Sequence, residues 1–414
     1  MELKKYKFAD LLTNEPQGVY GIPAPAEDFD PCKKRYLRIT DISDDGILLD
    51  TDKKSVSAPN IEQYLLQKND IVFARTGNST GRAYLYNEND GELAFAGFLI
   101  KYSVDPQKVN PLFLRYFTIS NYYKQWVQNL SVGSTRGNIS AKTFLDFPII
   151  LPNRKQQDFL AKILNDIDTK IAINKKLTKE LESMAKELYD YWFVQFDFPG
   201  IDGKPYKSSG GKMIYNTILK REIPEGWEVK KLEDLAKIQK HQITPKAGIE
   251  YKHYSLPSFD ECESYSIENG NTIFSDKFLV ESGNLLISKL NPWTDRTVWV
   301  DDVSNAICST EYVVLKQNDK CIQSYLNQIA HTQSFIDYCT SCSTGTSHSH
   351  RRVKPELMTG YKVPFQENIV KAFGNQIYPI IQKKLIIQNE NRELTILRDE
   401  LLPMLMNGQV SVKE

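Results

Sequence analysis

Two halves of this 414-residue chain repeat one another, and this duplication constrains the fold more than any other feature of the sequence. Gly133 opens GSTRGNIS and Gly345 opens GTSHSHRR, 212 residues apart, and Pro152 and Pro364 have the same separation. Upstream, NDIVFARTGNSTGR (69–82) aligns with GNLLISKLNPWTDR (283–296) at an offset of 214, as GFLI (97–100) does with EYVV (311–314). The repeats of solenoids are only roughly 20–50 residues long, so these blocks predict two copies of one domain-sized unit.

Each copy combines strand patterns with a long helix. In the first copy, the runs YLRITDI, DIVFA and GFLIKYSV are separated by the turn sequences DDG, TGN and NDGE, which predicts strands joined by loops. From Asn153 the pattern changes, because Asn153 and Gln156 have the spacing of a capping box. Apolar residues then follow in steps of three and four, interrupted by Asn174 and Thr178. This apolar stripe consists of Leu160, Leu164, Ile167, Ile171, Leu181, Met184 and Leu188.

A second narrow stripe predicts a matching helix near the end of the chain, interrupted by Lys384 and Asn391. It consists of Phe373, Ile377, Ile380, Ile387, Leu394, Leu397, Leu401 and Leu405. Two such stripes would bury each other as an antiparallel coiled-coil pair, or would pack on the helices of a partner. We expect Pro379 to kink the second helix or to cost it a hydrogen bond, and no clean N-cap precedes Gln366.

Glycine, proline and serine are concentrated in FDFPGIDGKPYKSSGGKM, which indicates a linker over residues 196–213. After it, IPEGWEVKKLEDLAKI begins the second copy much as KYKFADLL begins the first. The expected fold class is α+β, with two similar mixed α/β domains separated by two long antiparallel coiled-coil helices. The expected order is a first domain over 1–152, a helix over 153–195, the linker over 196–213, a second domain over 214–364 and a helix over 365–408.

Charge and apolar composition exclude several classes of protein. Lysine plus arginine equals aspartate plus glutamate at 52 each, so any binding to a polyanion must come from local patches. The start of the chain lacks the apolar stretch of a signal peptide, and no run of about 18 apolar residues is present, so we expect a cytoplasmic protein without a membrane partner. The six cysteines are irregularly spaced, unlike a secreted disulfide framework.

The two basic, hydroxyl-rich segments GSTRGNIS (133–140) and GTSHSHRR (345–352) are predicted to be loops that are suited to reading DNA. Arginine and lysine bind phosphates and guanine edges, while asparagine, serine and threonine make shorter bonds. A helix of roughly 40 residues is about 60 Å long, ample to separate two readers by one turn of duplex, about 34 Å. For any single residue an ordinary polar turn is the alternative. The first-copy candidates are Arg75, Thr76, Asn78, Ser79, Arg82, Thr135, Arg136 and Asn138, and the second-copy candidates are Lys289, Asn291, Trp293, Arg296, Ser347, His348, His350, Arg351 and Arg352.

Because the copies share a framework but differ in loop residues, the expected DNA target is asymmetric and has two parts. At this point the whole chain resembles the specificity subunit of Type I restriction-modification systems. The resemblance rests on NDIVFARTGNSTG and GNLLISKLN, on GSTRGNISAKTFLDFPIILPNRKQQDFLAKIL, and on the closing LRDELLPMLMNGQV.

This resemblance implies two target recognition domains, a helical spacer that sets the gap between two half-sites, and no catalysis in this chain. The implied partners are double-stranded DNA, two adenine methyltransferase subunits that use S-adenosylmethionine, and restriction subunits that use ATP and magnesium. The chain itself is expected to bind no cofactor and no metal. The second copy departs from the first in having HSHRR where the first has RGNIS.

Other motifs are incomplete. CTSC (339–342) with His348 and His350 has the residue types of a zinc site, but the histidines follow too closely for a zinc finger. GNSTGR (77–82) lacks the lysine and hydroxyl ending of a phosphate loop, and NPWT (291–294) lacks the second proline of an amino-methyltransferase motif. Asp50 and Asp52 beside Lys53 are typical of a solvated loop. A stand-alone methyltransferase or nuclease, and a coiled-coil scaffold without DNA function, remain the alternatives.

Overall fold

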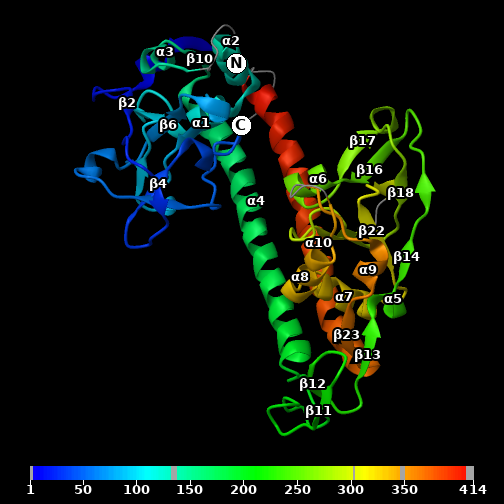
Figure 1. The fold of residues 1–414 in the computed structure, drawn as a ribbon. Helices are drawn as coiled ribbons and strands as arrows, with labels where there is room; N and C mark the ends of the chain where they lie inside the picture. Colours follow the sequence, from blue (N-terminus) through cyan, green and yellow to red (C-terminus); the bar gives the residue numbers. More distant parts are fainter. Residues whose placement is uncertain (1–2, 132–137, 302–303, 346–349, 407–414) are drawn as a thin grey trace. The chain divides into compact units, whose positions relative to one another are not determined.

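The computed structural model describes residues 3–131, 138–301, 304–345 and 350–406, which form two compact units (Figure 1). Unit 1 consists of Met1–Ile171 and Leu394–Glu414, and unit 2 of Ala172–Glu393. Each unit therefore takes one part of each long helix. Among the described residues, no helix has both the length and the apolar character needed to span a bilayer.

Unit 1 contains two four-stranded sheets, and an inner strand of the first, β6 (Asp70–Ala74), is buried along its whole length. The first sheet has the order β2 (Val19–Tyr20), β9 (Leu99–Ser103), β6, β7 (Ala83–Leu85). The second has the order β3 (Glu27–Asp28), β5 (Lys54–Val56), β4 (Lys34–Leu37), β8 (Leu93–Phe95), in which β4 and β8 are parallel. Strand β1 (Lys4–Lys7) pairs with β10 (Pro148–Leu151), and the helices are α1 (Pro111–Ile119), α2 (Asn121–Ser131) and α3 (Ala141–Leu145). Because side chains alternate along β6, Phe73 and Val72 enter two different cores.

Unit 2 repeats this plan. Its first sheet has the order β14 (Lys237–Gln239), β22 (Tyr312–Lys316), β19 (Leu285–Ser288), β20 (Thr297–Trp299). Its second has the order β15 (Gln242–Ile243), β18 (Lys277–Leu279), β21 (Ala306–Cys308), β16 (Glu250–Tyr254), β17 (Ser266–Asn269). Strand β13 (Glu228–Lys231) pairs with β23 (Lys362–Phe365), and β11 (Met213–Asn216) with β12 (Arg221–Pro224). The helices are α5 (Leu232–Leu235), α6 (Leu256–Cys262), α7 (Lys320–Ala330), α8 (Gln333–Ser341) and α9 (Pro355–Thr359).

Strand register confirms the duplication and corrects one alignment. Ile71 lies opposite Leu85 and Leu285 opposite Trp299, as the offset of 214 requires. However, Ala74 lies opposite Leu99 whereas Ser288 lies opposite Tyr312, which makes the offset of the third block 213 rather than 214. A shift of one residue would turn every side chain of the strand to the other face, and the apolar letters of GFLI and EYVV do not distinguish the two registers.

The two long helices run antiparallel within each unit. Helix α4 spans Arg154–Tyr189 and continues into a π-helical turn, Asp190–Val194, while α10 spans Glu367–Met406 without a break at Pro379. In unit 1, Asp168 of α4 lies 3.3 Å from Arg398 of α10. In unit 2, the Asn174 side chain donates to Glu390 at 2.7 Å. Of the two arrangements that the sequence left open, the structure has the antiparallel pairing within one chain.

Burial along the helices differs in part from the expected stripes. Asn174 and Thr178 are buried, although they were expected to interrupt the stripe, and Ala185 is buried beyond them. In contrast, Met184 is 58% exposed and Leu397 is 44% exposed. A strict alternation of three and four steps runs through Ile171, Asn174 and Thr178, so helix geometry rather than side-chain polarity determines which positions face inward.

Both long helices have side-chain caps. The Asn153 side chain accepts from the Gln156 amide at 3.0 Å, as the capping box predicts, while Gln156 Oε1 has no partner among the described residues. The expectation of no clean cap before α10 was wrong, because the Gln366 side chain accepts from the Ile369 amide at 2.7 Å. Glutamine is not a usual N-cap residue, so this cap could not be predicted from residue type.

Residues 196–213, the expected linker, pack onto unit 2. Phe196 and Phe198 are buried in its largest core. The Phe198 ring stacks on Tyr206 at 4.8 Å, and the Ser208 amide donates to Asp197 at 2.7 Å. The aromatic residues among the glycines and prolines therefore make this segment part of a compact fold rather than an open connection.

Candidate nucleic-acid interface

In both units a basic residue follows the central strand and is held by the same backbone bonds. In unit 1 the Arg75 amide donates to the Phe98 carbonyl at 3.1 Å, and the Ile139 amide donates to the Arg75 carbonyl at 2.9 Å. In unit 2 the Lys289 amide donates to the Glu311 carbonyl at 2.8 Å, and the Val353 amide donates to the Lys289 carbonyl at 3.1 Å. The loop after the central strand and the loop before the long helix, far apart in sequence, therefore meet at the same point in each copy.

The side chain of Arg75 brings two first-copy candidates together. Its Nε donates to Asn138 Oδ1 at 3.1 Å, and its guanidinium lies over the Tyr20 ring, 4.9 Å from the centroid. Asn138 is exposed and Tyr20 is 41% exposed, so this group reaches the surface. Tyr20 was not among the sequence candidates, because its strand lies far from either loop in the chain. The candidates Thr135 and Arg136 lie outside the described residues.

The turn after Arg75 presents its candidates unequally. Gly77–Ser79 form a 3₁₀ turn in which Asn78 is exposed and Thr76 is half-buried, whereas Ser79 is buried. Gly81 has φ +86°, and a Cβ at this position would lie 2.6 Å from a methyl carbon of Val127. The glycine therefore allows the turn to lie directly on α2. Asn78 is the candidate of this turn that is most open to a ligand.

Equivalent arginines pair with equivalent carboxylates in the two units. Arg82 Nε lies 2.7 Å from Asp44 Oδ1 in unit 1, and Arg296 Nε lies 2.7 Å from Asp260 Oδ1 in unit 2. Arg82 also donates to the Ile42 carbonyl at 3.0 Å. Both arginines were DNA candidates, but these bonds direct them toward holding neighbouring loops. A contact of either arginine with DNA would have to compete with its carboxylate.

The second-copy candidates surround one turn. Asn291 has φ +50°, and its amide donates to the Arg351 carbonyl at 2.8 Å. Arg351 donates to the Ser343 carbonyl at 2.7 Å, and Arg352 makes a two-bonded ion pair with Glu311 at 2.9 and 3.2 Å. This pair raises the pKa of Arg352, chiefly through the side-chain hydrogen bond.

Three further second-copy candidates lie at the surface, and two lie outside the described residues. Trp293 is 43% exposed, His350 is exposed, and Lys289 is half-buried without a side-chain hydrogen bond to any described residue. An exposed indole is suited to stacking on a base, and a basic side chain is suited to phosphate contact. The candidates Ser347 and His348 are in the undescribed segment 346–349.

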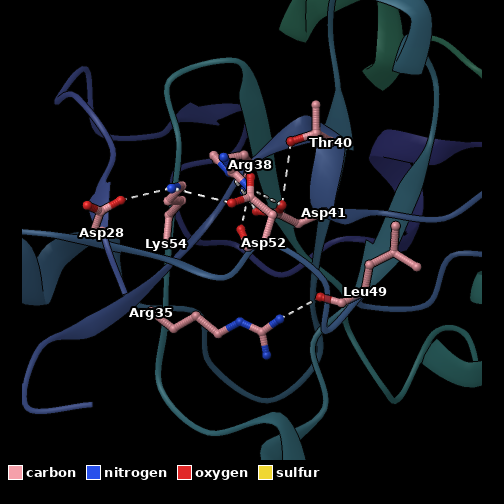
Figure 2. Close-up of polar contacts among 8 residues, drawn as sticks. All are labelled: Asp28, Arg35, Arg38, Thr40, Asp41, Leu49, Asp52 and Lys54. Carbon is pink, nitrogen blue, oxygen red and sulfur yellow. Dashed lines mark hydrogen bonds and ion pairs between the residues drawn. The ribbon is translucent and has the colours of Figure 1, made fainter. Parts of the chain in front are cut away.

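A charged network that was not predicted from the sequence surrounds Arg38 in unit 1 (Figure 2). Asp41 accepts from the Arg38 amide at 2.8 Å and from Arg38 Nη2 at 2.7 Å, and Arg38 also contacts Asp52 at 3.2 Å. Asp52 in turn faces Lys54, which bonds to Asp28 at 3.0 Å. The hydrogen bond from Arg38 is the largest of the effects that lower the pKa of Asp52.

The same turn has different chemistry in unit 2. There the Ser255 amide donates to Ser258 Oγ at 2.9 Å, which reproduces the bond from the Arg38 amide to Asp41. An arginine and a carboxylate in one copy therefore correspond to two serines in the other. The hydrogen bond from the backbone amide is retained while the side chains of the turn change.

The family described as the Type I restriction modification DNA specificity domain matches residues 27–183, which include the first-copy site and most of α4. Among curated relatives, the specificity subunit of the MjaIX Type I restriction enzyme from Methanocaldococcus jannaschii is 22% identical over 314 residues, covering 73% of this chain and 69% of the relative. That of the HindI enzyme from Haemophilus influenzae is 22% identical over 432 residues, covering 85% and 89%. Over most of its length the chain is therefore similar to specificity subunits of Type I restriction-modification systems.

A solved specificity subunit has the same fold. The crystal structure of the S subunit from M. genitalium has a TM-score of 0.59 to this chain at 15% identity, and the match covers 98% of this chain and 96% of that one. The duplicated α+β architecture with long helices is therefore a fold that this chain shares with that S subunit.

The sulfur and imidazole groups of the chain do not gather into a metal-ligand set within the described residues. In CTSC, Cys339 is buried in the unit 2 core, where burial raises the pKa of its thiol to about 12. A neutral buried thiol is a packing group rather than a nucleophile or a ligand.

Proposed function

We propose that this specificity subunit recognises an asymmetric DNA site made of two half-sites, one through residues 1–152 and the other through residues 214–364. These two segments are the target recognition domains, and the helices over 153–195 and 365–408 form the spacer between them. The backbone bonds shared by Arg75 and Lys289 carry the proposal, since they place two different sets of side chains on one framework.

Recognition rests on groups that suit direct readout. Arg75 with Asn138 in the first domain, and Lys289 with Trp293 in the second, offer donors and a ring at the surface. Arginine and asparagine can each make two bonds to a base edge in the major groove. The pairs of Arg82 with Asp44 and of Arg296 with Asp260 keep the surrounding loops in place.

The chain would act as a scaffold rather than as a catalyst. Two adenine methyltransferase subunits would bring S-adenosylmethionine, and restriction subunits would bring ATP and magnesium, in a cytoplasmic complex. The methyltransferase subunits would dock on the long helices, which carry the exposed apolar residues Ile173 and Ile386, 57% and 62% exposed.

The test is to co-express the chain with its methyltransferase subunit and to map methylated adenines on genomic DNA by single-molecule sequencing. We expect a motif of two short half-sites with a fixed unread gap. Replacing residues 1–152 by those of another specificity subunit should change one half-site only. Methylation at one continuous site, or none despite a stable complex, would refute the two-domain reading.

A further inference from the structure

Arg398, on the C-terminal part of α10, is a buried cation in unit 1. Its side chain is 7% exposed and meets Asp168 of α4 at 3.3 Å and Asp45 at 3.1 Å. Asp168 also accepts from Arg115 at 3.1 Å and from the Tyr116 hydroxyl at 2.8 Å, both on α1. A single guanidinium therefore joins the two long helices to the body of the first recognition domain.

The contact with Asp45 leads directly toward the DNA candidates. Asp45 lies in the turn 43–46, whose preceding carboxylate, Asp44, holds Arg82. Gly46 ends this turn, and a Cβ there would lie 2.8 Å from the Ala83 carbonyl of β7. The turn is therefore packed against the sheet that carries the recognition loop, and adjacent aspartates connect that loop to α10.

The second unit keeps one half of this arrangement and lacks the other. Arg296 and Asp260 reproduce the pair of Arg82 with Asp44. At the offset of 213 residues that relates the long helices, however, Arg398 corresponds to Ala185 and Asp168 to Ile381. Ala185 and Ile381 line a cavity of about 1190 Å³ between the helices and the body of unit 2. The equivalent positions of unit 2 thus carry no charge, and its contact between α10 and the body is of another kind, with Arg392 over the Tyr265 ring at 4.0 Å.

We propose that Arg398 is a positioning residue that fixes the first recognition domain on the helix pair and so restricts the gap between the half-sites. The inference rests on the proposed two-domain function. A buried, multiply paired guanidinium holds its partners in one geometry, because its planar donors fit carboxylates in fixed directions. Loss of Arg398 would leave the contacts to the bases intact. The position of the first recognition domain on the helix pair would, however, be less restricted.

The experiment uses the complex of the full chain with its methyltransferase subunits and a plasmid library. The library carries both half-sites with gaps from two base pairs shorter to two base pairs longer than the native gap. The variants are Arg398→Met and Asp45→Asn. Arg398→Met retains the length of the side chain, and Asp168 keeps Arg115 and Tyr116. Asp45→Asn removes the negative charge that pairs with Arg398 in the turn and leaves Asp168 in place, and the Asp45 side chain is 44% exposed.

We expect both variants to keep the half-site sequences and to raise methylation at altered gaps, relative to the native gap, by about tenfold, within the roughly 5- to 150-fold typical of coupling between sites. Arg398→Lys should restore part of the preference. Leu397→Ala, at the exposed neighbouring position, should behave as the wild type. Folded variants with the wild-type gap preference, or with equal losses at every gap, would refute the role of Arg398. A wild-type complex without a two-part motif would instead refute the proposed function.

Discussion

Arg75 and Lys289 occupy equivalent places, yet their surroundings differ at the level of single atoms. The guanidinium of Arg75 is oriented by Asn138 and lies over Tyr20, whereas the Lys289 ammonium has no hydrogen bond to a described side chain. An oriented guanidinium is suited to a two-bonded contact with a guanine edge, while an ammonium without a fixed direction is suited to a phosphate. Discrimination between bases at the first half-site should therefore depend more on Arg75 than discrimination at the second half-site depends on Lys289.

Arg75→Ala should weaken discrimination at the first half-site by about 1–3 kcal/mol, roughly 5- to 150-fold, and leave the second half-site unchanged. The measurement is the methylation rate on plasmids with single substitutions in either half-site. Arg82→Ala is the matched control. Its partner Asp44 is 75% exposed, so loss of the pair should cost at most about 1 kcal/mol of stability and little selectivity. Equal loss in both half-sites would contradict the assignment of Arg75.

His253 gives a pH dependence to unit 2. Burial lowers the pKa of His253 more than Glu268, 3.1 Å away, raises it. The unfolded chain, with a histidine pKa of about 6.5, therefore binds the proton more readily than the folded chain. The free energy of unfolding should fall as the pH decreases below about 6.5. His253→Gln should reduce this dependence in urea titrations across that range, and an unchanged dependence would exclude His253 as its source.

Among the structural elements, the long helices show most clearly how polarity and position can disagree. Asn174 lies in the buried seam of α4 and donates to Glu390 of α10. A buried amide paired across a helix seam fixes the register of the helices at some cost in stability. The register of this part of the helix pair thus depends on a polar contact.

Asn174→Ala should destabilise unit 2 by about 1–3 kcal/mol, because it removes a buried hydrogen-bond donor. Ile173→Ala, at a neighbouring position that is 57% exposed, should change the free energy of unfolding by at most about 0.5 kcal/mol. Chemical denaturation of the full chain followed by circular dichroism measures both. Similar effects of the two substitutions would show that Asn174 does not face the seam.

The duplication, the mixed strands and the two helices could be predicted from the sequence because they depend on local periodicity and on comparison within the chain. Contacts between distant residues could not. Arg82 was a reasonable DNA candidate until Asp44, 38 residues earlier, was found beside it. Likewise, Tyr20 and Arg75 are far apart in sequence, and they meet because strands β2 and β6 belong to the same sheet. Periodicity also treated Asn174 as an interruption, since it weighs polarity and cannot see a partner on another helix.

At the scale of the whole molecule, balanced charge limits what the chain can do alone. With 52 basic and 52 acidic residues, some of them in ion pairs such as Arg352 with Glu311, the chain has no net excess of cations to attract phosphates. Affinity for DNA in general grows with the number of phosphates that are neutralised. Partner subunits should therefore supply much of the affinity, while this chain supplies the choice of sequence.

We expect the isolated chain to bind DNA weakly and with a shallow dependence on salt, and the complex with methyltransferase subunits to bind tightly and with a steeper one. Fluorescence anisotropy between about 50 and 200 mM salt distinguishes the two cases. Over this range, a protein that makes 6–10 phosphate contacts loses roughly 10³- to 10⁵-fold in affinity for DNA. A steep slope for the isolated chain would show that its own basic residues make most of the phosphate contacts.

The order of the chain within the two units has a consequence for biosynthesis. Unit 2 is continuous in sequence, whereas unit 1 is completed only by Leu394–Glu414, and Leu402 belongs to the same core as Leu160 and Leu164. On the ribosome, the unit that begins to be translated first therefore completes its core only after the continuous unit 2 has been made. A stop codon just before Leu394 would thus leave unit 2 whole and remove part of the core of unit 1.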